Sequence, residues 1–186
     1  KMAAVIPTNG LGVDAGLDIA GGNLTFTTAD KGVHLGVTSA TAANLMDDYE
    51  EGTFTPTLNG TGGSASGVTY TSRLGWYEKI GHNVQAHIWL NSNSMSSVPT
   101  GNLQITNLPF TSKNTTNFYH AISVSFAANF SGTESPQGGY ITANETKINI
   151  TTRASSDGRS GLTEAVACST MSGNEQIMIT ASYRTE

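Results

Sequence analysis

The chain has 186 residues, of which 12% are charged and 37% are apolar, and its formal net charge at pH 7 is −5. This length suits one substantial domain with a smaller piece attached. Lysine and arginine form no cluster, which argues against nucleic acid as a partner, because phosphate neutralisation needs clustered cations. No stretch approaches the ~20 apolar residues of a membrane-spanning helix, so membrane insertion is not expected.

The first 46 residues have a pattern of their own. Short apolar alternations such as Leu24/Phe26 and Val33/Leu35 are interrupted by glycine. Strands of about three to five residues cannot bury a core within one chain. We therefore expect residues 1–46 to form a short intertwined β shaft, in which equivalent strands from several subunits wrap one symmetry axis.

Four acidic residues, Asp47, Asp48, Glu50 and Glu51, follow this segment. They could be catalytic carboxylates, a calcium site or a solvated junction between two kinds of structure. Adjacent acids at a polar junction lack the apolar surroundings that raise the pKa of a catalytic acid, so we favour the junction. The sequence leaves open whether a cation occupies residues 47–51. It also contains no recognisable catalytic, nucleotide or metal motif, so no catalytic residue, metal ligand or cofactor is assigned.

Regular alternation of apolar and polar residues begins at residue 53 and predicts strands separated by turns. No helical window interrupts them. This pattern is typical of an all-β, antiparallel β-sandwich of the jelly-roll type, which we expect to form a head domain over residues 47–186. The predicted strands are 53–58, 68–80, 82–90, 101–110, 118–130, 139–144, 146–153, 163–170 and 175–183.

The same alternation predicts which side chains face the core. The inward faces of strands 82–90 and 118–130 carry Val84, Ala86, Ile88 and Leu90, and Phe118, Ile122, Val124, Phe126 and Phe130, respectively. The other face of the first strand carries His87 and Trp89, and an exposed tryptophan beside a histidine is unusual on a lone domain. We expect these two side chains to form a subunit interface. Cover by another strand of the same sandwich is the alternative.

Three stretches carry a resemblance to a known family: DDYEEGTFTPTL from residue 47, GVTYTSRLGWYEKIGHNV from residue 67 and GNLQITNLPF from residue 101. They resemble the C-terminal region of bacteriophage tail-fibre and related virion receptor-binding proteins, over about residues 30–110. Phe54 replaces the family's tryptophan, and Asn107 replaces a glycine. The resemblance implies a homotrimer in the virion, outside the cell, whose partners are a host-surface glycan or protein and other tail proteins.

The expected function is therefore that of a non-enzymatic distal tail-fibre domain that binds a host receptor as a homotrimer. Two other classes stay open. One is a structural virion protein, such as a head fibre, decoration or tail cap, whose head binds nothing. The other is a polysaccharide-degrading tailspike, which we rank third.

The direction of the strands predicts where receptor-binding loops lie. Successive antiparallel strands alternate direction, so their connections alternate between the two ends of a sandwich. This places loops 59–67, 91–100, 131–138 and 154–162 far from the shaft, and connections 80–82, 111–117, 144–146 and 171–174 beside it. Binding groups usually lie on the loops of a rigid scaffold. The predicted receptor-binding side chains are Asn91, Asn93, Glu134, Gln137, Asp157 and Arg159.

Overall fold

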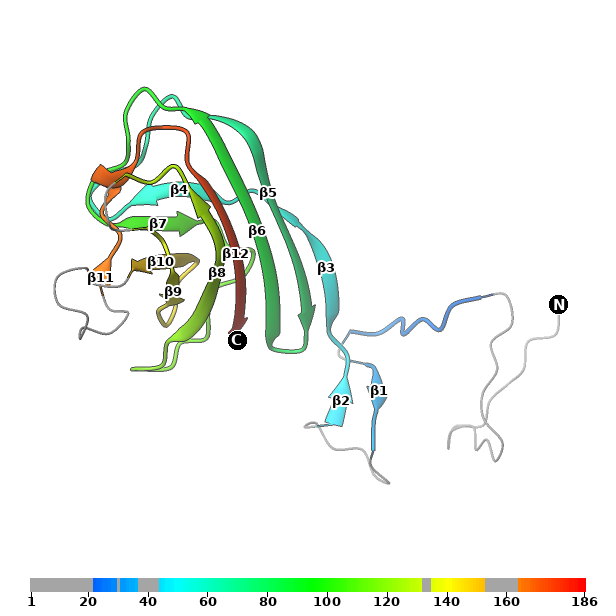
Figure 1. Ribbon diagram of the computed structural model, residues 1–186. Helices are drawn as coiled ribbons and strands as arrows, with labels where there is room; N and C mark the ends of the chain where they lie inside the picture. Colours follow the sequence, from blue (N-terminus) through cyan, green and yellow to red (C-terminus); the bar gives the residue numbers. More distant parts are fainter. Residues whose placement is uncertain (1–21, 30, 37–43, 132–134, 153–163) are drawn as a thin grey trace, which may run out of the picture.

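The computed structural model of the chain describes residues 22–29, 31–36, 44–131, 135–152 and 164–186. Within these residues the regular secondary structure consists of β-strands, apart from the short 3-10 helix η2 (Cys168–Thr170) and a 3-10 residue at Asn44. Figure 1 shows a curled sheet with an N-terminal segment leading away from it. The predicted all-β antiparallel fold is confirmed.

The head is one ten-stranded antiparallel sheet within the described part of the chain. The end of β10 also pairs with the short strand β11 (Glu164–Ala165). The other strands, in spatial order, are β3 (Tyr49–Phe54), β5 (Thr69–Ile80), β6 (Asn83–Ser94), β12 (Gln176–Arg184), β8 (His120–Ala128), β9 (Gly138–Ile141), β10 (Lys147–Thr152), β7 (Leu103–Thr106) and β4 (Thr57–Gly60).

The sheet curls until its two edges meet at a single bend. β3 and β4 are opposite edges, yet only Thr55 and Pro56 separate them in sequence. Pro56 has no N–H to donate to a neighbouring strand, so the backbone pairing of β3 ends before it. Arg73 on β5 donates its Nε–H to the Pro56 carbonyl at 2.7 Å and holds the bend. The predicted strand 53–58 is therefore two strands, and the layers of the sandwich belong to one continuous sheet.

The core lies between the long strands β5, β6, β12 and β8 and the shorter strands β9, β10, β7 and β4 (Figure 1). Burying one such aliphatic side chain contributes about 1.5–3 kcal/mol. The prediction for β6 is confirmed, because each of its four inward side chains is buried. The buried core includes Val84, Ala86, Ile88, Leu90, Leu103, Ile105, Ile122, Ile148, Ile150, Ile177 and Ile179.

The predicted inward face of strand 118–130 is wrong at Phe118 and Phe126. Phe118 precedes β8, and Phe126 is 44% exposed. A β-bulge in the pairing of β8 with β12 places one additional residue, Ser125, on β8. One inserted residue reverses the alternation beyond it, so the Phe126 ring lies on the outer face of the sheet.

Gly75 allows the Phe54 ring to lie directly on β5. A Cβ at position 75 would stand 2.5 Å from Cε1 of Phe54. We expect Gly75→Ala to lower the free energy of unfolding by about 1–3 kcal/mol, because the ring must leave its site. The control is Gly138→Ala on β9, whose Cβ would meet only the Thr151 Oγ1, at 3.5 Å. Equal urea midpoints for the two variants would contradict this packing.

Cys168 is a free cysteine, completely buried in the core. Burial raises the pKa of its thiol from 9.0 to about 11. As pH rises, the unfolded chain loses this proton first, so the stability gained from the neutral thiol is complete below pH 9 and declines between about pH 9 and 11. We expect a maleimide at pH 8 to label Cys168 far faster in urea than in buffer. Equal labelling rates would show that the thiol is accessible in the folded protein.

The residues of the family resemblance meet where the head begins. Lys79 forms an ion pair with Asp48, and its Nζ also lies 5.5 Å from the centroid of the Phe110 ring. Gly81, at φ +54°, makes the turn after β5 and donates its N–H to the Asp48 carbonyl at 2.7 Å. Glycine adopts this left-handed conformation without a Cβ clash. The Lys-Ile-Gly sequence thus joins β5 to the acidic segment.

A second set of contacts uses Glu50 and Glu51, the two acids of this segment that lie on β3. The Tyr77 hydroxyl donates to Glu50 Oε1 at 2.5 Å, and this hydrogen bond raises the pKa of Tyr77. The Phe110 ring stands edge-on to Tyr77, with centroids 5.2 Å apart. Among the described residues no group of three or more histidine, cysteine, aspartate or glutamate side chains could hold a metal ion. The acids of β3 instead contact hydroxyl groups of β3 and β5.

The segment before the head contains the two-stranded sheet of β1 (Val33–His34) and β2 (Leu45–Met46). Several of its large apolar side chains are exposed. The division of the chain at residue 46 stays a prediction, and residues 1–21, 30 and 37–43 of the predicted shaft lie outside the described residues. The exposed side chains are Leu24, Phe26, Val33, Leu35 and Met46.

Candidate functional site

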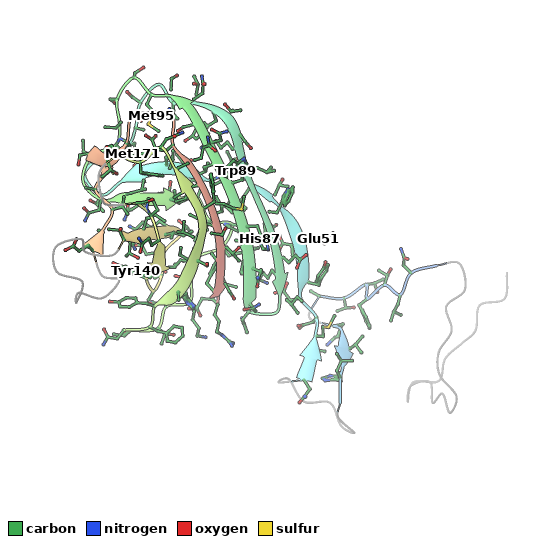
Figure 2. The ribbon with its side chains drawn as sticks, in the orientation of Figure 1. Glu51, His87, Trp89, Met95, Tyr140 and Met171 are labelled. Carbon is green, nitrogen blue, oxygen red and sulfur yellow. The ribbon has the colours of Figure 1, made fainter. Side chains whose placement is uncertain are left out.

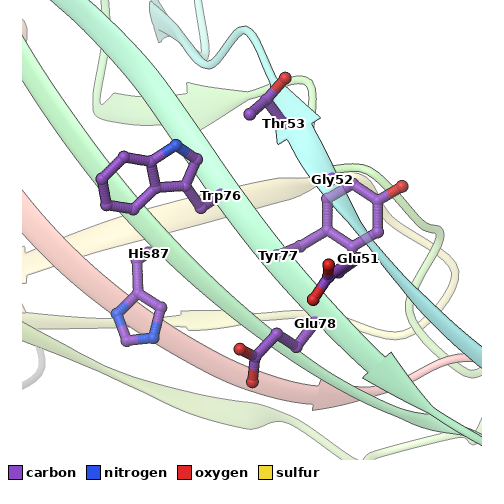
Figure 3. Close-up of a pocket in the computed structure, with 7 residues that line it drawn as sticks. All are labelled: Glu51, Gly52, Thr53, Trp76, Tyr77, Glu78 and His87. Carbon is purple, nitrogen blue, oxygen red and sulfur yellow. The ribbon is translucent and has the colours of Figure 1, made fainter.

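An open groove runs over the outer face of β3, β5, β6 and β12. It consists of two hollows, of about 410 and 260 Å³, that share Trp76 and His87. Figure 3 shows the larger hollow, with these two side chains on neighbouring strands. We define the outer-face groove by the residues Glu51, Thr53, Leu74, Trp76, Glu78, His87, Trp89, Met178 and Thr180.

The pairing of the strands places these side chains together. Trp76 on β5 pairs with His87 on β6, and Leu74 pairs with Trp89. Successive side chains of a strand point to opposite faces. Since the even-numbered residues of β6 fill the core, His87 and Trp89 point outward. Figure 2 shows both on the long strand, away from the shorter layer.

The apolar half of the groove is built around two indole rings. Trp89 is half-buried and packs against the Phe126 ring, with centroids 5.9 Å apart. Trp76 remains 57% exposed. The Nδ1 of His87 lies 3.4 Å from the Oγ1 of Thr180, and the pairing of His87 with Trp76 places the imidazole beside the exposed indole. The groove therefore presents a flat apolar surface next to a polar ring.

The other half of the groove is acidic. Glu51 on β3 pairs directly with Glu78 on β5, and Figure 3 shows both side chains in the larger hollow. The Tyr49 hydroxyl donates to Glu51 Oε2 at 2.7 Å, and this hydrogen bond raises the pKa of Tyr49. Neither hollow has a lysine or arginine among the described residues that line it. These carboxylates therefore offer acceptor oxygens to a bound molecule.

This arrangement fits a sugar chain. The apolar face of a pyranose ring can lie on an exposed indole, and its hydroxyl groups can donate to carboxylates and bond to an imidazole. Binding sites commonly combine such aromatic surfaces with a few fixed polar groups. Two carboxylates on either side of a sugar can also take part in glycoside hydrolysis.

The predicted receptor-binding residues are not brought together at this groove. Asn91 and Asn93 lie on β6 and not on a loop, because this strand continues to Ser94. Gln137 is exposed, and its backbone N–H donates to the Thr151 carbonyl at 3.0 Å. The predicted residues Glu134, Asp157 and Arg159 lie outside the described residues.

The predicted placement of connection 171–174 beside the shaft is wrong. Ser92, near the far end of β6, donates its backbone N–H to the Glu175 carbonyl at 2.9 Å, so this turn lies far from the shaft. The predicted strand 163–170 is in fact the two residues of β11 followed by η2. Because no full strand crosses the head at this point, the connections that follow do not alternate between its two ends as predicted. The predicted neighbours 59–67 and 91–100 do lie together, through bridges such as Ser66 with Ser97.

Sequence reasoning found the outward orientation of His87 and Trp89 but missed the rest of the groove. The signal was present in strand 68–80, where Leu74, Trp76 and Glu78 share one face by alternation. Pairing with the acidic segment could not be read from either strand alone. The interface role of His87 and Trp89 stays a prediction.

Comparison with known proteins gives two partial matches and no matching protein-family profile. Over 72 residues the chain is 35% identical to the capsule KN4-specific depolymerase of Klebsiella phage K64-1. This match covers 39% of the chain and 9% of that depolymerase. The fold is similar to that of the Dettilon tailspike protein, with a TM-score of 0.56 and 22% sequence identity over 73% of this chain and 24% of that chain. The chain therefore spans a small part of either protein.

These matches correct the expected function. The prediction of no enzymatic activity is wrong, since the similar proteins are a capsule depolymerase and a tailspike. Ranking the tailspike class third was wrong for the same reason. The coarser prediction of a phage tail receptor-binding protein is supported, and the predicted location in the virion is confirmed. None of the described helices is long and apolar enough to cross a membrane.

Proposed function

We propose that the chain is the glycan-binding head of a phage tail receptor-binding protein of the tailspike type. The outer-face groove is the proposed site for a host-surface polysaccharide. The observation that carries this proposal is the exposed Trp76 ring, which lies between two hollows and beside His87 and the Glu51–Glu78 pair. A large aromatic side chain that stays exposed in a groove is typical of a binding site and not of a head that only caps a fibre.

The open shape of the groove suits weak binding that is multiplied by several copies. A single site of millimolar affinity corresponds to ~4 kcal/mol. Three linked sites on one repetitive polymer raise the effective affinity without any new contact. A homotrimer, which the family resemblance implies, would provide this multivalency.

Binding to whole cells tests the proposal. The fluorescently labelled chain is incubated with encapsulated host bacteria and with an isogenic strain that makes no capsule. We expect labelling of the encapsulated strain alone. Equal labelling of both strains, or of neither, would contradict a polysaccharide receptor and favour a structural virion role.

Degradation of the polysaccharide belongs to the same proposal, at the level of the whole protein. Purified capsular polysaccharide is incubated with this chain, and newly formed reducing ends are measured. If reducing ends form, replacement of Glu51 and of Glu78 by glutamine shows whether the groove is the place of cleavage. If none form, this chain alone does not cleave the polymer, and the cell-labelling experiment tests the groove as a binding site.

The proposed trimer is tested by mass. We expect light scattering to give three times the chain mass of 19.4 kDa. The physical reason is the row of exposed apolar side chains before the head, including Leu24, Phe26 and Leu35, which need cover from neighbouring subunits. A folded monomer at micromolar concentration would contradict the proposal.

The predicted subunit interface at Trp89 and the proposed groove lead to different expected results for the same variant. If this side chain lies between subunits, Trp89→Ala should lower the mass measured by light scattering. If it belongs to the groove, the variant keeps the mass of the wild-type protein and binds less polysaccharide. The two roles are therefore distinguished in one experiment.

A further inference from the structure

A second cavity lies on the opposite layer of the head. It has a volume of about 170 Å³ and is lined by residues of β7, β9, β10 and β11 and of the connections after β4 and before β7. Figure 2 shows Tyr140, one of its lining residues, away from His87 and Trp89. We define the β9–β10 pocket by its polar and aromatic lining residues Thr61, Asn102, Tyr140, Asn149 and Thr151.

The character of this pocket differs from that of the groove. Among the described residues its lining contains two amides, two hydroxyl groups and one phenol ring, and no charged side chain. Tyr140 and Asn149 form a cross-strand pair whose side chains alternate with buried Ile141, Ile148 and Ile150. Both therefore stand on the outer face, with the ring 37% exposed.

Two hydrogen bonds fix the polar groups in place. Gln104 donates its Nε2–H to Asn149 Oδ1 at 2.8 Å. This leaves the NH₂ group of Asn149 without a partner among the described residues. Thr61 Oγ1 accepts the Asn102 N–H at 2.9 Å, so its own hydroxyl hydrogen can be donated elsewhere. The described lining residues thus offer oriented donors and carry no net charge.

We propose that the β9–β10 pocket binds one uncharged hexopyranose unit. Its volume suits a single sugar ring, and Tyr140 supplies an aromatic surface at its edge. The Asn149 amide and the Thr61 hydroxyl can donate to ring hydroxyl oxygens, whereas an ionic ligand would find no opposite charge among the described lining residues. Thr61 lies on a connection predicted to face the receptor, and Gln137 of another such loop bonds to the Thr151 carbonyl.

The test is a set of amide NMR titrations of the intact chain with methyl glycosides of glucose, galactose and mannose, each to ~50 mM, a range set by the millimolar affinity expected of one small site. We expect at least one glycoside to shift the side-chain NH₂ signals of Asn149 and Asn102 in a saturable manner. Absence of any shift at these signals for all three glycosides would overturn the proposal.

Matched variants separate binding from general perturbation. Tyr140→Leu removes the ring of the pocket, and Tyr119→Leu removes the adjacent ring, whose centroid lies 5.5 Å away but which does not line the pocket. The first should weaken the apparent affinity by about fivefold or more, the loss expected for an aromatic anchor. The second should leave it unchanged. Equal affinities in both variants would overturn the proposal.

This inference does not depend on the outer-face groove. Both tryptophans of the chain, Trp76 and Trp89, belong to the groove. Their indole signals therefore report the groove, and the Asn149 amide reports the pocket, in the same spectra. Either proposal can fail while the other stands.

Discussion

Replacement of Glu175 by alanine is expected to lower the free energy of unfolding by about 2–4 kcal/mol. The carboxylate is only 1% exposed, yet no cation neutralises it among the described residues. Its Oε1 accepts the backbone N–H groups of Ser172 and Gly173, the second at 2.8 Å, and its Oε2 accepts the Ser92 hydroxyl at 3.3 Å. Alanine would leave the N–H groups of Ser172 and Gly173 without this acceptor, whereas the Ser92 hydroxyl would keep its second acceptor, the Glu175 carbonyl, at 3.1 Å.

Urea denaturation of three proteins measures this effect. Glu175→Gln keeps one acceptor oxygen and should lose about half as much stability as the alanine variant. Glu78→Ala removes an exposed carboxylate and should change stability by about 0.5 kcal/mol or less. If Glu175→Ala were as stable as Glu78→Ala, the turn at 172–173 would not depend on the buried carboxylate.

Replacement of Trp76 by alanine should weaken binding to capsular polysaccharide at least about tenfold, because an aromatic anchor in the centre of a site typically contributes ~1.4 kcal/mol or more to binding. The indole packs against little of the protein, so the variant should keep its melting temperature within a few degrees. Binding is measured by interferometry with immobilised polysaccharide.

The control for this variant is Tyr119→Ala, which removes an aromatic ring that is 61% exposed but lies outside the groove. It should bind like the wild-type protein. Equal losses in the two variants would show that binding follows general exposure of aromatic rings and not the groove.

The fold could be predicted because alternation is a local property. The four buried side chains of β6, from Val84 to Leu90, follow directly from period two. The same rule failed at Phe126, since a single bulge residue on β8 reverses the faces beyond it. It failed again after β10, where a two-residue strand and a 3-10 turn replace a full strand and change which end the chain reaches.

The site was harder to predict because it depends on the pairing of strands. His87 and Trp89 were placed on the outer face correctly, but their neighbours come from β3 and β5. Glu51 meets Glu78 only because the acidic segment pairs with residues 75–80 in one particular register. That register is set by contacts such as the ion pair of Lys79 with Asp48, which no single strand reveals.

The most direct test of the proposed groove uses the indole N–H signals of the intact chain during titration with purified capsular polysaccharide. The chain contains two tryptophans, so the spectrum has two such signals, and both report the outer-face groove. We predict that the Trp76 signal shifts or broadens in a saturable manner, with a smaller effect on Trp89. Binding that leaves both indole signals unchanged would contradict the assignment of the polysaccharide to this groove.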